Sequence, residues 1–100
     1  MRFIAFFTFV ATANAITSIF PNTQSNCHPQ VVLNPIIDRC GDTILLDHDI
    51  RGARIVYDGQ KVIWYDSSNG VGCKGRSASV QTSTDCYTLP FSPACVRILC

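Results

Sequence analysis

The segment RIVYDGQKVIWY at residues 54–65 carries the strongest local signal in the sequence. Two runs of β-branched and aromatic residues flank Asp58-Gly59. Asp-Gly between such runs is typical of a two-residue hairpin turn, because a type I′ turn needs positive φ at both central positions. This register places Ile55 opposite Val62 and puts large apolar side chains on both faces of the hairpin. We therefore expect both faces to be covered, as in two packed sheets.

Shorter strand signals lie on both sides of this segment. Apolar runs at 31–33 and 44–46 are bounded by turn residues, and each predicts a brief buried strand. A glycine-rich turn at 66–72 precedes the alternating residues 77–81, which predict a half-buried strand, and residues 95–99 predict the last one. No stretch has an apolar stripe at helical spacing. The sequence therefore predicts an all-β domain, a small sandwich.

The N-terminal residues have the layout of a secretory signal peptide. Arg2 precedes an apolar run at 3–11, and the small-residue site Ala13-Asn14-Ala15 follows. The run is much shorter than the ~20 residues that a membrane-spanning helix requires, so we expect no stable membrane insertion. The sequence predicts that residues 1–15 are removed and that the mature protein is secreted and extracellular.

The chain after residue 15 is short enough for a single domain. Residues 16–26 are rich in polar residues and have little periodicity, so they predict an extended N-terminal arm. The ordered, disulfide-rich β domain is expected at 27–100.

Six cysteines lie in this domain: Cys27, Cys40, Cys73, Cys86, Cys95 and Cys100. An even number in a short exported chain predicts three disulfides, and no Cys-x-x-Cys pair supports a zinc site. A small core leaves little net stability, which bridges of about 2–4 kcal/mol each can supplement. The pairing stays open at this point, because six cysteines allow 15 connectivities.

The charge of the chain excludes some partners. Arg2 belongs to the predicted signal peptide, and the remaining lysines and arginines equal the seven aspartates in number, with no glutamate present. Nucleic acids and anionic membranes call for a basic surplus, so we expect neither as a partner. The short basic stretch Lys74-Gly75-Arg76 is expected in a solvated loop.

Residues Lys61 to Ile98 resemble one βγ-crystallin Greek-key motif, as found in small secreted cysteine-rich fungal effectors and killer-toxin-like proteins. Four segments carry the resemblance: VIWY at 62–65, CKGRS at 73–77, DCYTL at 85–89 and CVRI at 95–98. In this family a strand-end aromatic packs over a hairpin that contains aromatic-x-Gly, and a serine before the final strand hydrogen-bonds to it. Cys73 and Cys95 stand at the positions of that second aromatic and that serine. The resemblance implies a disulfide-stapled Greek-key β-sandwich in which disulfides replace these contacts.

The resemblance also bears on calcium. The family's ligand positions fall on Pro90-Phe91 and Ala94-Cys95, and none of these four residues has a side-chain oxygen. Ca²⁺ takes six to eight oxygen ligands, carboxylates among them, so we expect no calcium and no other cofactor.

Candidates for catalysis are sparse. Asp47-His48-Asp49 is expected to be a polar turn, because successive residues of an extended segment point to opposite faces. His28 and His48 could form the acid/base pair of a ribonuclease, with Lys61 or an arginine holding the phosphate. The glutamate base of the small fungal ribonucleases is missing, however, because the sequence contains no glutamate. No Gly-x-Ser-x-Gly turn supports a serine hydrolase.

Trp64 and Tyr65 could present an aromatic surface to a ligand, but aromatic residues of strands are more often part of the core. No residue set carries a catalytic assignment, so we expect a protein that is not an enzyme. The sequence favours an extracellular effector that binds a host or competitor target, either a protein or a component of the cell wall. A killer-type or antimicrobial toxin and an inhibitor of a secreted host enzyme remain alternatives.

Overall fold

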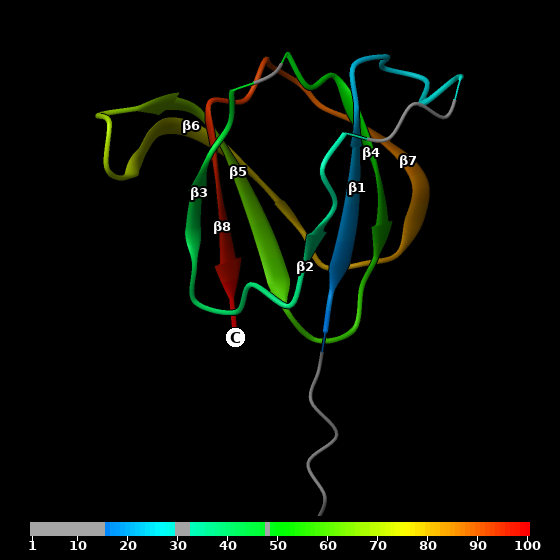
Figure 1. Cartoon of the computed structure of the whole chain (residues 1–100), viewed down its shortest axis with the longest axis horizontal. Coiled ribbons are helices and arrows are strands. Elements are labelled where there is room, and N and C mark those ends of the chain that lie inside the picture. The colour runs from blue at the N-terminus through cyan, green and yellow to red at the C-terminus, as the bar shows by residue number, and fades with distance from the viewer. Residues whose placement is uncertain (1–15, 30–32, 48) are drawn as a thin grey trace, which may run out of the picture.

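The computed structural model describes residues 16–29, 33–47 and 49–100, and this part of the chain forms eight strands and no helix. The strands make two antiparallel sheets that face each other (Figure 1). Sheet A has the order β2 (Ile36–Ile37), β1 (Ser18–Asn22), β4 (Gly52–Val56), β7 (Thr84–Thr88). Sheet B has the order β3 (Thr43–Leu45), β8 (Cys95–Leu99), β5 (Lys61–Ser68), β6 (Cys73–Val80). The all-β, disulfide-stapled sandwich is confirmed; the predicted signal peptide at 1–15 lies outside the described residues.

The two halves of the chain have the same strand order. In the first half β2, β1 and β4 are neighbours, and in the second half β6, β5 and β8 are neighbours in the corresponding order. The third strand of each half joins the other sheet: β3 pairs with β8, and β7 pairs with β4. Neither sheet is therefore complete without a strand from the other half of the chain.

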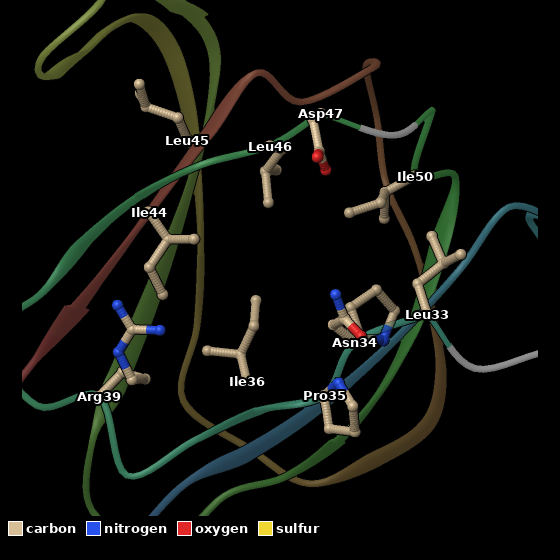
Figure 2. Close-up of a pocket in the computed structure, with 11 residues that line it drawn as sticks. Leu33, Asn34, Pro35, Ile36, Arg39, Ile44, Leu45, Leu46, Asp47 and Ile50 are labelled. Carbon is tan, nitrogen blue, oxygen red and sulfur yellow. The ribbon is translucent and has the colours of Figure 1, made fainter.

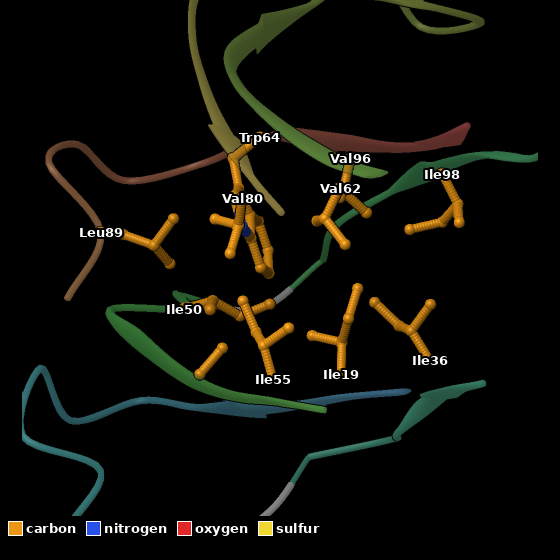
Figure 3. Close-up of a cluster of buried hydrophobic side chains, with 11 residues drawn as sticks. Ile19, Ile36, Ile50, Ile55, Val62, Trp64, Val80, Leu89, Val96 and Ile98 are labelled. Carbon is orange, nitrogen blue, oxygen red and sulfur yellow. The ribbon is translucent and has the colours of Figure 1, made fainter. Parts of the chain in front are cut away.

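The hydrophobic core lies between the sheets (Figure 3). Ile19 and Ile55 of sheet A face the indole of Trp64 and aliphatic side chains of sheet B such as Val62. These four side chains are fully buried. Burial of this kind contributes about 1.5–3 kcal/mol per large apolar side chain. The core role predicted for Trp64 is confirmed, whereas Tyr65 points to the outer side of sheet B and is half-buried.

The predicted hairpin at 54–65 is wrong. Its two runs belong to different sheets, and Asp58-Gly59 connects β4 to β5 across the sandwich. The hydroxyl of Thr17 fixes this connection, because its Oγ1 accepts hydrogen bonds from the backbone N–H groups of Asp58 and Gln60, each at 3.0 Å. The sandwich forms, but not by covering both faces of a hairpin; Val56 is 41% exposed on the outer side of sheet A.

The predicted arm at 16–26 is also placed differently. Residues 18–22 form β1, an interior strand between β2 and β4, so the ordered domain begins before Cys27. Pro21 hides this strand in the sequence, because proline is rare inside sheets. Here β2 pairs only with Ser18 and Ile19 of β1. Pro21 therefore has no strand partner on that side, and its missing N–H costs no hydrogen bond to β2.

The other strand predictions are partly right. Residues 95–99 are β8, and residues 77–80 lie in β6, which starts earlier than predicted, at Cys73. The run at 44–46 contributes to β3, but Leu45 is 47% exposed because β3 is an edge strand. Of the run at 31–33, only Leu33 is among the described residues, and it is not in a strand.

All six cysteines are paired, as predicted. The pairs are Cys27–Cys86, Cys40–Cys100 and Cys73–Cys95, with Cα–Cα distances of 5.8, 5.2 and 5.3 Å. The first two pairs span 59 and 60 residues. They fasten irregular connections of the first half to β7, which contains Cys86, and to Cys100, which directly follows β8. The third pair joins the beginning of β6 to the beginning of β8.

Candidate functional site

The β5–β6 hairpin projects from the sandwich and ends in a tight turn (Figure 1). Residues 69–72 form this turn, the hairpin tip. Val71 at the tip is 83% exposed, whereas the other exposed large apolar side chains in the described part of the chain are 41–47% exposed. An aliphatic side chain held almost entirely in water gains the full transfer free energy, about 1.5–3 kcal/mol, when a partner buries it.

Hydrogen bonds order the backbone of the hairpin tip. The side-chain Oδ1 of Asn69 accepts from the N–H groups of Val71 at 3.1 Å and Gly72 at 2.8 Å. Ser68 Oγ accepts from the N–H of Gly70 at 3.0 Å, and the backbone N–H of Asn69 donates to the carbonyl of Gly72 at 3.1 Å. Val71 is therefore presented in a defined position before any partner binds.

A β-bulge interrupts the β5–β6 hairpin two residue pairs before the tip. The pairing of β5 with β6 shifts register opposite Asp66, where Gly75 and Arg76 together face one residue. Gly75 has φ +88°, and a Cβ there would collide with Oδ1 of Asp66. The same oxygen accepts from the backbone N–H of Arg76 at 2.9 Å, and Oδ2 accepts from its Nε at 2.7 Å.

This contact also changes the acidity of Asp66. The hydrogen bonds from Arg76 hold the pKa of the Asp66 carboxyl below its usual range, so it is ionised at neutral pH. Arg76 also lies 5.3 Å from the ring centroid of Phe91, a cation–π contact that ties the hairpin to the loop before β8. Together with Cys73–Cys95, whose first cysteine directly follows the hairpin tip, these contacts tie the hairpin to β8 and to the loop before it. Lys74-Gly75-Arg76 lies in a strand, not in a loop as predicted.

An apolar cavity opens at the opposite flank, between the short edge strands β2 and β3 (Figure 2). Its volume is about 220 Å³. The lining is mainly aliphatic and includes Ile36, Ile44, Leu46 and Ile50, whose side chains point toward a common space in Figure 2. Arg39 stands at one end of this space and Asp47 at the other.

The cavity follows from a difference in side-chain size between the two halves. Pro21 and Ala53 are paired in sheet A, at the position that Trp64 and Val96 occupy in sheet B. The larger pair fills its part of the sandwich, whereas Pro21 lines the cavity.

The structure does not assemble the ribonuclease-like residues. β1 begins beside Val56 and ends beside Gly52, so the connection that holds His28 lies at the end of the sandwich opposite to Lys61. His28 is exposed, and His48 lies outside the described residues. Burial raises the pKa of the Tyr87 phenol, so this group is no base at neutral pH.

The aspartates on either side of His48 make interactions within the protein. Asp49 accepts hydrogen bonds from Arg51 Nε at 3.3 Å and Ser92 Oγ at 2.9 Å. Asp47 lines the cavity and already has an interaction within the protein. In the described part of the chain, no three His, Cys, Asp or Glu residues gather closely enough to hold a metal ion.

The positions aligned with the family's calcium ligands have structural roles. Cys95 is fully buried in its disulfide, Phe91 lies under Arg76, and the N–H of Ala94 donates to the carbonyl of Tyr65 at 2.8 Å.

Among the described residues there is also no helix of the length and apolarity that a membrane crossing requires.

Comparison with protein-family models, curated protein sequences and solved structures finds no significant match. The geometry of the hairpin and of the cavity therefore provides the basis for inferring a function. Sequence reasoning missed Val71 because a single aliphatic residue in a glycine-rich turn looks unremarkable. The signal that could have found it is Ser68-Asn69-Gly70, whose side chains favour local hydrogen bonds to the backbone.

Proposed function

We propose that the protein is secreted and acts outside the cell as a small cysteine-rich effector that binds a protein target, without catalysing a reaction. The contact is made by the hairpin tip, with Val71 as the anchor. The observation that carries this proposal is the 83% exposure of Val71 on a turn that is already ordered by its own hydrogen bonds. Three disulfides in so short a chain support an oxidising, extracellular location.

Two physical properties of the hairpin favour binding. A pre-ordered turn has lost its conformational entropy on folding, so less is lost on association. An aliphatic anchor also fits the pattern in which a few well-placed side chains contribute most of the binding free energy. An apolar anchor favours a protein pocket over a polar cell-wall polysaccharide, and exposed Lys74 favours acidic residues at the rim of that pocket.

The alternatives have less support. Gly70 has φ +95°, and the N–H of Asn69 bonds to the carbonyl of Gly72, so the tip is a closed turn. A protease cleft that holds its substrate as an extended strand would not accept such a turn, which disfavours a substrate-like inhibitor at this site. The absence of a basic surplus disfavours a toxin that acts on anionic membranes.

The exchange of β3 and β7 between the halves supports the Greek-key part of the resemblance, because it gives each half three strands in one sheet and one in the other. In this view residues 18–56 are a second motif that the sequence disguises.

The test is affinity capture with the oxidised protein spanning residues 16–100, using extracellular fluid of a host or competitor. Two baits are compared with the parent: Val71→Asp at the tip and Val56→Asp on the outer side of sheet A. We expect a partner that binds the parent and the Val56→Asp bait but not the Val71→Asp bait. Equal recovery on all three baits would refute the hairpin as the binding site, and rapid turnover of a captured molecule would refute the non-catalytic assignment.

A further inference from the structure

The cavity between β2 and β3 has the composition of a small-ligand site. Most of its lining is aliphatic and comes from both sheets and their connections, and its volume is about 220 Å³. A dry apolar cavity of roughly 150 Å³ is enough to hold a benzene molecule, whereas drug-sized ligands need about 300 Å³ or more. The space therefore suits one ring or one short aliphatic chain.

Three polar side chains line the cavity: Arg39 and Asp47, which carry charge, and Asn34, whose amide is neutral. Arg39 lies at the end opposite to Asp47 (Figure 2). Arg39 Nε donates to Asp42, and both side chains are about half exposed, at 48% and 45%. Because an arginine has five N–H donors, its two Nη groups can still serve a second acceptor.

The arrangement favours an anionic head group at the Arg39 end. A carboxylate accepts two parallel hydrogen bonds from a guanidinium, which matches the geometry of the Nη groups. The Asp47 carboxylate repels an anion from the opposite end, and Asp47 already interacts with the chain itself.

We propose that the cavity between β2 and β3 binds a small apolar monocarboxylic acid, with its chain or ring among Ile36, Ile44 and Leu46 and its carboxylate on Arg39. The ligand has about six to eight carbon atoms, given the cavity volume. This site is remote in the strand order from the β5–β6 hairpin, so it is independent of the proposed function.

Three probes separate the contributions of charge and chain: octanoate, octanol, which lacks the acid, and acetate, which lacks the chain. The parent protein is titrated with each, and backbone amide shifts are followed by ¹H–¹⁵N NMR. We expect octanoate to shift amides of β2, β3 and the residues that flank them, saturably and at least tenfold more tightly than octanol. Acetate should produce no saturable shift there.

Two variants and a control test the assignment. Arg39→Gln is expected to lower the affinity for octanoate to that for octanol. The fold should tolerate this substitution, because the Arg39 side chain is about half exposed. Leu46→Phe fills the space and should abolish both. Arg54→Gln, which removes an arginine stacked on Phe20 at 4.3 Å on the outer side of sheet A, should change neither.

Several outcomes would overturn the proposal. One is the absence of a saturable octanoate shift up to about 10 mM, at the upper end of the micromolar-to-millimolar range of weak ligands. Another is a set of shifts that map outside the cavity. The third is a preference for octanoate over octanol that persists in Arg39→Gln. If Leu46→Phe does not fold, the Arg39→Gln comparison alone decides, because octanoate and octanol differ only at the head group.

Discussion

The two halves of the sandwich share one strand order but differ in how they are held. In the second half, β5 and β6 are eight residues each, and a four-residue turn joins them. In the first half, the strand that corresponds to β6 is β2, with two residues, and an irregular connection separates it from β1. Two disulfides fasten the irregular connections of the first half, whereas the second half combines long strand pairing, a bulge and an ordered turn with its own bridge, Cys73–Cys95. The regular half presents the rigid hairpin, and the irregular half leaves the cavity.

The largest expected effect comes from removing single disulfides in pairs of Cys→Ser substitutions. Loop-entropy arguments give about 4 kcal/mol for a loop near 60 residues and about 3 kcal/mol for one near 22. We expect Cys40→Ser with Cys100→Ser to lower the free energy of unfolding more than Cys73→Ser with Cys95→Ser. Denaturant titration followed by the fluorescence of Trp64, the single tryptophan, measures both. The reverse order would show that the first half does not depend on its bridges.

A smaller effect is expected from glycines of the hairpin. Gly75→Ala forces a left-handed φ on alanine and a collision with Asp66, and should cost about 2–3 kcal/mol. Gly70→Ala meets no atom within 4 Å but has φ +95°, and should cost about 1 kcal/mol. Gly72→Ala is the matched control, because its Cβ would meet only Asn69 Oδ1, at 3.7 Å. Three equal losses in thermal unfolding would contradict the bulge as the structural determinant.

The order of the hairpin tip can be measured by amide hydrogen exchange. Asn69→Ala removes the acceptor of the Val71 and Gly72 amides, and loss of about 1 kcal/mol should speed their exchange about fivefold. Asn26→Ala is the control in the first half, since Asn26 Oδ1 accepts a hydrogen bond from the nearby His28 amide at 3.0 Å, a contact far from the tip. We expect it to leave the tip unchanged. Fast exchange of the tip amides already in the parent would mean that the turn is not pre-ordered.

The smallest effect is the pH dependence of Asp66. Its pKa is lowered in the folded protein, so its ionised form stabilises the hairpin at neutral pH. This contribution is complete above the unfolded value of about 4 and disappears as the pH falls through the lower folded pKa. We expect the Arg76 amide shift of the parent to titrate only below about pH 4, and Asp66→Asn to show no such step. An unchanged titration in Asp66→Asn would assign the step to another group.

The sequence predicted the strands of the second half more completely than those of the first. Alternation and end residues located residues 95–99 and the end of β6, and the cysteine count indicated complete pairing. The prediction at 54–65 failed because Asp58-Gly59 has the local chemistry of a hairpin turn, while the crossing between sheets is set by Thr17, far away in sequence. β1 was missed because Pro21 breaks the strand pattern.

The candidate sites were still harder to predict. The exposure of Val71 depends on how far the hairpin projects, which a local pattern does not encode. The cavity depends on Pro21 standing where the other half has Trp64, and that correspondence is visible only once the strand order is known.

The most direct test of the central claim is the dissociation constant of the captured partner for Val71→Ala and for Val56→Ala. Both substitutions remove the same two methyl groups, from side chains that are 83% and 41% exposed. If the hairpin tip is the binding site, Val71→Ala should raise the dissociation constant about tenfold, equivalent to about 1.4 kcal/mol of lost burial, and Val56→Ala should stay within about twofold. Equal dissociation constants for Val71→Ala and the parent would contradict the account.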